Sequence, residues 1–183
     1  CQWRIESMVD VPRLSTAKLN SLLLKGLGDC VVYSQRTSEK PMLVDIMAPY
    51  KIKLRVYLYN CTNPPGGRSV DEYKSQIIVP GQKRGMKGNF DFSDDRIVIL
   101  GAYACLDEKA GTGVFVLWDA MFHVNFSYSA NIQIKSENIV AALATEVYHG
   151  KRNNNEVVIT CRGQYLKQAL IDRIRTVSLP RKA

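Results

Sequence analysis

KIKLRVYLYN, residues 51–60, is the most regular segment of this sequence and restricts the class of fold that the rest can form. Its side chains alternate in kind, and successive side chains of a β-strand point to opposite faces of a sheet. One face would carry Ile52, Leu54, Val56 and Leu58, and the other Lys51, Lys53, Arg55, Tyr57 and Tyr59. The segment therefore predicts a β-strand with one fully apolar face.

Seven further runs have the composition of strands. They cover residues 30–36, 42–48, 72–79, 96–105, 114–120, 129–135 and 157–162. Three other segments repeat apolar residues at helical spacing: residues 14–28, 136 to about 149 (with Ser136 as cap) and 164–175. Strands and helices do not alternate, which disfavours a doubly wound parallel sheet. We expect an α+β fold, mainly β: a curved, mostly antiparallel sheet or open pseudo-barrel with two to three peripheral helices.

Length and composition fit one soluble globular domain, residues 1–183, taken as a fragment of a longer polypeptide. Hydrophobic residues make up 46% and charged residues 23% of the chain, as in folded soluble proteins. No apolar run approaches the roughly 18 residues of a membrane span, and residues 1–15 lack the apolar centre of a secretory signal. We therefore expect a cytoplasmic location without membrane contact.

The balance of charge indicates the class of partner. There are 25 Lys and Arg against 17 Asp and Glu, a net charge of +8, which favours a polyanion such as nucleic acid. The five cysteines are scattered and the chain has two histidines, so the clustered ligands of a zinc site are missing and structural thiols are expected. Glycine-rich nucleotide-binding motifs and a nucleophile elbow are also missing. We expect no cofactor for this domain.

A polar insert, residues 82–96, separates two predicted strands and is basic in its first half and acidic in its second. Lysine and arginine suit phosphates; amide side chains pair with adenine, arginine with guanine and aspartate with cytosine. Aspartates would add nothing to a binder of phosphates alone, so the mixed charge predicts base reading. The candidate residues of this first arm are Gln82, Lys83, Arg84, Lys87, Asn89, Asp91, Asp94, Asp95 and Arg96.

A second polar excursion, residues 122–133, follows another apolar strand. It interleaves aromatic residues with side chains that form hydrogen bonds, a mixture typical of nucleic-acid contacts. Its candidate residues are His123, Asn125, Tyr128, Ser129 and Asn131. Two such arms from one curved sheet would straddle a groove of duplex DNA.

Two neighbouring segments together resemble a module of restriction–modification proteins. They are YNCTNPPGGRSVDEYKSQIIVPGQKRGMKGNFDFSDDRIVILGAY, residues 59–103, and VFVLWDAMFHVNFSYSANIQIK, residues 114–135. Together they are similar to the DNA-recognition domains of type II restriction endonucleases, of the B3-like pseudo-barrel type. That resemblance implies a seven-stranded open barrel whose two arms hold the major groove of double-stranded DNA. It also implies a nuclease domain, with its Mg²⁺, elsewhere on the polypeptide.

Two alternatives stay open. A Mg²⁺-dependent nuclease site would use Glu72 and Lys74 on one strand with Asp45 or Asp71 as a further acid. A reader of modified cytosine would extrude the base and hold it with Trp118 and Asp119.

Overall fold

The computed structural model describes residues 12–47, 49–63 and 71–176. Nine strands and three α-helices lie within these ranges, together with the short 3₁₀ turns η1 (Gly28–Cys30), η2 (Ala120–Phe122) and η3 (Gly163–Tyr165). The order is α1 (Thr16–Leu27), β1 (Val31–Ser34), β2 (Met42–Ile46), β3 (Ile52–Asn60), β4 (Glu72–Ile77), β5 (Ile97–Asp107), β6 (Thr112–Trp118), β7 (Ala130–Lys135), α2 (Ser136–Ala144), β8 (Val147–Lys151), β9 (Val157–Arg162) and α3 (Leu166–Arg175). Both ends of the predicted domain 1–183 lie outside the described residues.

Seven strands form one mixed sheet in the order β1-β2-β3-β5-β6-β9-β8, while β4 and β7 pair separately as a two-stranded ribbon. All neighbours in the large sheet are antiparallel except β3 and β5. These two run parallel because the chain leaves the sheet after β3, forms β4 in the ribbon and returns in the same direction. The sheet does not close into a barrel. The expected α+β, mainly β fold with a curved and mostly antiparallel sheet is confirmed.

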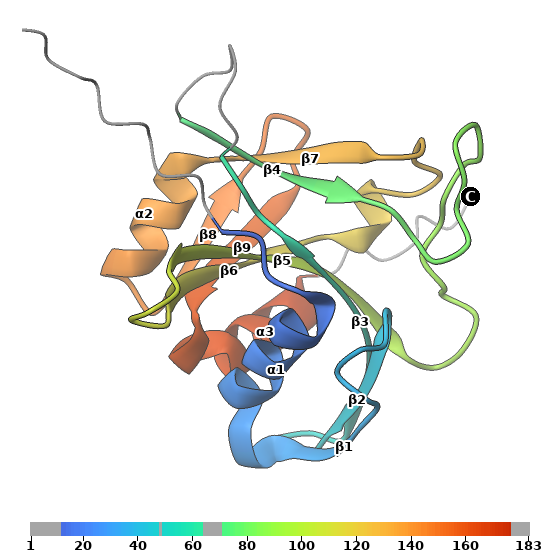
Figure 1. Ribbon diagram of the computed structural model, residues 1–183. Helices are drawn as coiled ribbons and strands as arrows, with labels where there is room; N and C mark the ends of the chain where they lie inside the picture. Colours follow the sequence, from blue (N-terminus) through green and yellow to red (C-terminus); the bar gives the residue numbers. More distant parts are fainter. Residues whose placement is uncertain (1–11, 48, 64–70, 177–183) are drawn as a thin grey trace, which may run out of the picture.

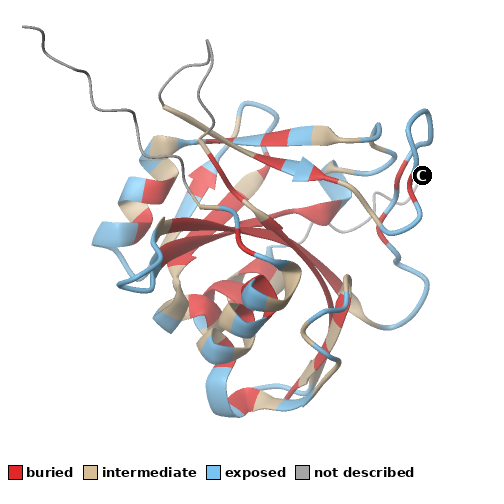
Figure 2. Cartoon of the chain, viewed as in Figure 1, coloured by how far each residue is buried: buried red, intermediate tan, exposed pale blue. Residues whose placement is uncertain are grey.

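The large sheet is covered on both faces, so the described residues form three layers (Figure 1). Helices α1 and α3 pack on one face, around Leu23, Leu58 and Phe115. The ribbon and α2 cover the opposite face, around Leu100, Trp118 and Ile132. Figure 2 shows the resulting band of buried residues along the central strands. Burial on both faces explains why the middle strands are apolar almost throughout.

Strand β3 is buried on a second face because the ribbon covers the side of the sheet opposite the helices. The predicted apolar face, with Leu54, Val56 and Leu58, packs against the helices. The opposite face is buried from Arg55 onward: Tyr57 and Tyr59 lie under the ribbon and Arg55 is 6% exposed, while Lys51 and Lys53 are exposed. The alternation of side chains therefore identified the strand correctly, but it did not show that a further layer covers its second face.

One strand was not predicted. Residues 136–149 were expected to form a single helix, but α2 ends at Ala144 and the chain turns into β8. Strand β8 pairs along its whole length with β9, from Val147 opposite Cys161 to Lys151 opposite Val157. These backbone hydrogen bonds come from a distant segment and outweigh the local helical pattern. Ser136 is the first helical residue rather than the cap, and its N–H donates to the carbonyl of Asp71 at 2.7 Å.

The cysteines of the described residues support the prediction of structural thiols. Cys30, Cys61, Cys105 and Cys161 are all buried and unbonded to one another. Burial raises the pKa of the Cys61 and Cys161 thiols to about 12, so neither provides a thiolate at neutral pH. No helix in the part of the chain that the structure describes is long and apolar enough to span a membrane.

Candidate nucleic-acid interface

The outward face of the β4–β7 ribbon carries polar side chains in matched cross-strand pairs. Buried and more exposed residues alternate along β7 and along the second half of β4, while Glu72, Tyr73 and Lys74 are all half-buried. The outward side chains form three rungs opposite one another: Glu72 with Lys135, Lys74 with Gln133, and Gln76 with Asn131. Rungs on the same face of a strand repeat about every 6.8 Å, twice the rise per residue. The ribbon thus presents a short ladder of amide and lysine side chains.

The inward face of the ribbon fixes this ladder in place. Ile77, Ile132 and Ile134 are at most 5% exposed and belong to the core beneath the ribbon. Ser75 is fully buried between them in register. Among the described residues, β4 and β7 are the outermost layer on this side of the sheet (Figure 1), so their outward side chains point away from the core.

The two predicted arms meet beside one end of the ribbon. Gly88 and Phe126 exchange two backbone hydrogen bonds, of 2.8 and 3.0 Å. The Oδ1 of Asn89 accepts a 2.6 Å hydrogen bond from the backbone N–H of Asn125. Phe90 packs between Tyr57 and Phe126, with ring centroids 4.8 and 5.1 Å apart. We call residues 81–90 and 122–129 together the joined lobe. The expectation of two separate arms straddling a groove is therefore wrong.

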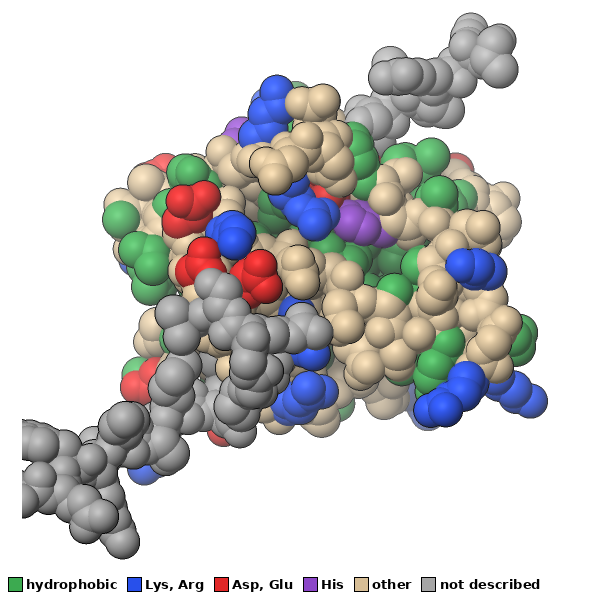
Figure 3. Space-filling view, turned by 90° about the horizontal axis from the view of Figure 1, so that it is seen from above, with side chains coloured by type: hydrophobic (Ala, Val, Ile, Leu, Met, Phe, Trp, Pro, Cys, Tyr) green, Lys and Arg blue, Asp and Glu red, His purple; other side chains and the backbone are tan. Residues whose placement is uncertain are grey.

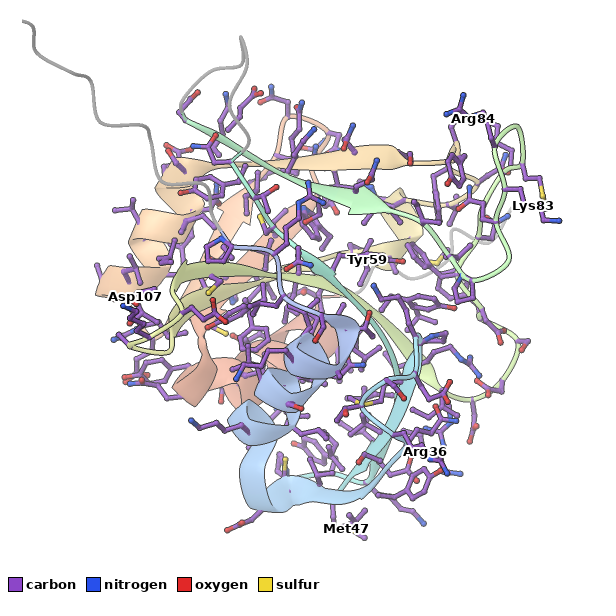
Figure 4. All side chains as sticks on the ribbon, in the orientation of Figure 1. Arg36, Met47, Tyr59, Lys83, Arg84 and Asp107 are labelled. Atoms are coloured by element: carbon purple, nitrogen blue, oxygen red, sulfur yellow. The ribbon has the colours of Figure 1, made fainter. Side chains whose placement is uncertain are left out.

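The joined lobe exposes three basic side chains. Lys83, Arg84 and Lys87 are all exposed, and Figure 4 shows Lys83 and Arg84 pointing away from the body of the molecule. The Nζ of Lys87 donates to the Oγ of Ser127 at 3.0 Å. Seen from above in Figure 3, Lys and Arg side chains are spread over much of this face, while several Asp and Glu side chains gather in one region. The three exposed basic side chains of the lobe would attract a phosphate backbone.

The family comparison matches residues 52–170 to the methylase-associated X1 (MTaX1) model. The chain belongs to the MTaX1 family. The match runs from β3 into α3 and includes both the ribbon and the joined lobe. No curated protein and no solved structure matches the chain. The family description agrees with the restriction–modification context that the resemblance implied; the B3-like type is not confirmed.

Four other predicted residues of the lobe and β7 remain accessible in this MTaX1 protein. Asn125 and Tyr128 are exposed, and Asn131 lies on the outward face of β7. Ser129 is half-buried and its Oγ accepts a 3.0 Å hydrogen bond from Gln76 Nε2, which joins the lobe to the ribbon. Asn125 and Ser129 have φ angles of 52° and 59°, which shape the tight turns of this segment. Their role in binding DNA stays a prediction.

Gln82 has an internal role. Its side chain is 9% exposed. The Oε1 atom accepts from the N–H of Val79 at 3.2 Å, and Nε2 donates to the carbonyls of Met86 and Phe126 at 3.1 and 3.4 Å. Since the amide is used inside the lobe, Gln82 is no longer a candidate for reading adenine.

The substitution Gln82→Ala is expected to loosen the joined lobe. It leaves the carbonyls of Met86 and Phe126 without this donor, at a cost of about 1–3 kcal/mol. Hydrogen exchange should therefore speed up at the Gly88 and Phe126 amides, while the amides of β5 and β6 keep their protection. Unchanged exchange at Gly88 would contradict the role assigned to Gln82.

The acidic half of the insert lies against the start of the sheet. Asp94 forms a two-point ion pair with Arg55, with contacts of 2.6 and 2.9 Å, and Arg55 also donates to the carbonyl of Asp91. The hydrogen bond from Arg55 lowers the pKa of Asp94. Arg96 pairs with Asp45 at 2.8 Å. Three charged residues of this half are thus used inside the protein, which removes the reason for expecting them at base edges: Asp91, Asp94 and Arg96. Asp95, in contrast, is exposed beside Lys51 and Lys53.

His123 is held in a buried network of charges. Its Nε2 lies 2.7 Å from Oε2 of Glu156, which is fully buried. The same carboxylate accepts from Arg152 Nη1 at 2.7 Å and from the backbone N–H of Asp119 at 3.1 Å. Burial alone would raise the pKa of Glu156, but the bonds from His123 and Arg152 outweigh burial and lower it. His123 therefore anchors the second half of the lobe to the β8–β9 hairpin.

Both alternative sites are dispersed or buried. Trp118 and Asp119 are 1% and 3% exposed, so no base can stack on Trp118 in this fold. The carboxylates of Asp71 and Glu72 both lie near Lys135 Nζ, at 3.3 and 3.4 Å. Asp45, on β2, is paired with Arg96. Among the described residues, no group of three or more His, Cys, Asp or Glu side chains is placed to hold a metal ion.

Sequence reasoning did not place Lys74, Gln76 or Gln133 of the ribbon ladder at the DNA-binding site. Gln133 was noted only as part of the second excursion, and Lys74 only as part of a nuclease site. The signal that could have found them is the alternation in both strands, which places Lys74 with Gln76 and Gln133 with Asn131 on polar faces. Only the pairing of β4 with β7 brings the two polar faces together.

Proposed function

We propose that this MTaX1 chain is a module for sequence-specific binding of double-stranded DNA. The ladder of the β4–β7 ribbon carries the proposal, because the major groove admits a two-stranded ribbon and several known proteins read bases in this way. Gln76, Asn131 and Gln133 offer the paired donor and acceptor that recognise adenine, and Lys74 offers the donors that recognise guanine.

The joined lobe would lie alongside the groove. Lys83, Arg84 and Lys87 would contact phosphates, which fixes the register of the ribbon without reading sequence. This division of labour keeps the basic residues predicted for the first arm and moves base reading from the insert to the ribbon.

In the restriction–modification context, the module would supply target recognition to a partner that modifies or cuts DNA. An attached nuclease domain of a type II restriction endonuclease, with its own Mg²⁺, remains our preferred arrangement. The described part of the chain then needs no catalytic residues of its own.

Selection from a random duplex library tests the proposal directly. We expect enrichment of one short motif, because direct readout discriminates at about 1–3 kcal/mol for each base pair contacted by a good pair of hydrogen bonds. A protein that enriches no motif, or that binds no duplex at moderate salt, would rule out this function.

The substitution Arg84→Ala is expected to weaken phosphate binding by one contact. Each neutralised phosphate contributes about 0.9 to the slope of log K against log salt concentration, so the slope should fall by about that amount and affinity at 0.1 M salt by about tenfold. Titration at four salt concentrations measures both. The control is Lys109→Ala, an exposed lysine in the turn after β5, which should change neither; an equal effect of the two substitutions would show that only net charge matters.

A further inference from the structure

A hollow of about 610 Å³ opens beside the outward face of the ribbon. Its walls come from β7, the first turn of α2, β8 and the turn between β8 and β9. The apolar part of the lining is Ile134 and Val158, which are 3% and 1% exposed. The volume lies within the range of pockets for small ligands, and the hollow is separate from the joined lobe.

The side chains around this hollow are polar, and they include the acids Glu72 and Glu137. Some are engaged within the protein, such as Arg152 with Glu156 and Lys135 with Glu72, and others are not. Gln133, Asn153 and Lys151 make no side-chain hydrogen bond among the described residues. Asn154 uses its Oδ1 to accept from the N–H of Glu156 at 3.1 Å, which leaves its amide nitrogen available. Tyr148 contributes an aromatic wall. An aromatic wall and amides at the rim match a flat base with polar edges.

We propose that this hollow binds a single nucleotide. The base stacks against Tyr148, its edge is read by Gln133 and Asn153, and Lys151 neutralises the phosphate. Gln133 belongs both to the hollow and to the ribbon ladder. A base extruded from a duplex seated on the ribbon therefore has a short path into the hollow, and a free mononucleotide is the other source of the same chemistry. Binding of a base extruded from a duplex rests on the proposed function, whereas binding of a free mononucleotide does not.

The experiment has two arms. In the first, 2-aminopurine replaces each base of the selected site in turn, and its fluorescence is followed as the protein binds. Stacking in a duplex quenches this base, so extrusion is expected to raise the signal several-fold at one position. In the second, adenosine 5′-monophosphate and deoxycytidine 5′-monophosphate are titrated by calorimetry.

Two variants locate any signal in the hollow. Asn153→Trp fills it from an exposed turn position, and Lys151→Ala removes the phosphate contact; Lys109→Ala serves as the matched control. We expect both hollow variants to lower the fluorescence change or the mononucleotide affinity at least tenfold, with thermal unfolding unchanged.

The outcomes separate the two proposals. A duplex that binds its motif without any fluorescence change, together with no mononucleotide binding, overturns the hollow and leaves sequence-specific binding intact. Mononucleotide binding that Asn153→Trp abolishes, in a protein that ignores duplex DNA, supports the hollow and overturns the proposed function. If both variants leave the fluorescence change and the mononucleotide binding as they are in the wild-type protein, the nucleotide binds elsewhere and the proposal for the hollow is wrong.

Discussion

Replacing Gln76 and Asn131 together by alanine is expected to erase the preference of the MTaX1 chain for two base pairs of its target. The two side chains lie directly opposite one another on the outward face of the ribbon. Each amide that pairs with an adenine contributes about 1–3 kcal/mol of discrimination, and contributions of separate positions add roughly. The ratio of specific to random affinity should therefore fall by about 2–6 kcal/mol.

The measurement is a repeat of the duplex selection with the variant, followed by titration of the original site and a scrambled one. Binding to the scrambled duplex should stay nearly constant, because Lys83, Arg84 and Lys87 are untouched. The matched control replaces Gln164 and Gln168, two exposed amides on the helix side of the sheet, and should leave the motif unchanged. If the ribbon variant selects the original motif with the same strength, the ribbon does not read bases.

Replacing Glu156 by alanine is expected to lower the free energy of unfolding by about 3–5 kcal/mol, the usual loss when one partner of a buried ion pair is removed. The carboxylate is fully buried and accepts hydrogen bonds from His123, Arg152 and the backbone of Asp119. Its loss leaves these donors without an acceptor. Denaturant unfolding of the variant measures the change, and Glu137→Ala, an exposed acid in the first turn of α2, is the control.

The same carboxylate predicts a dependence of stability on pH. The hydrogen bonds from His123 and Arg152 hold the folded pKa of Glu156 below the ordinary value of 4.5. A lowered folded pKa means that the stabilisation is complete above the unfolded pKa and is lost as pH falls through the folded pKa. The wild-type protein should therefore lose stability below about pH 4.5 more steeply than Glu156→Ala. Parallel curves for the two proteins would show that Glu156 does not titrate with a lowered pKa.

Loss of Glu156 should also reach the joined lobe. His123 connects the lobe to the β8–β9 hairpin through this carboxylate, so hydrogen exchange in residues 122–126 should rise in Glu156→Ala at neutral pH. Such a change would explain a weaker affinity for DNA in a variant whose substitution lies outside the proposed contact surface.

The sequence by itself determined most of the strands and the helices α1 and α3. Residues 51–60 alternate strictly, and this pattern has the period of a strand whatever lies around it. Ser15 before the first helix likewise acts locally, since its Oγ accepts from the N–H of Lys18 only three residues away. Such features depend on neighbours in sequence, which is why the pattern of side chains was enough to find them.

Tertiary structure alone decided which polar residues face outward. Asp94 was a plausible base reader until the fold placed Arg55, 39 residues away, against its carboxylate. Gln82 was another until Phe126, 44 residues away, came within reach of its amide. Strand β8 exists because β9 offers it a ladder of hydrogen bonds. The sequence shows which side chains are polar, but hydrogen bonds between distant segments determine which of them are used inside the protein. Only the pairing of β4 with β7 aligns the outward polar side chains of the ribbon.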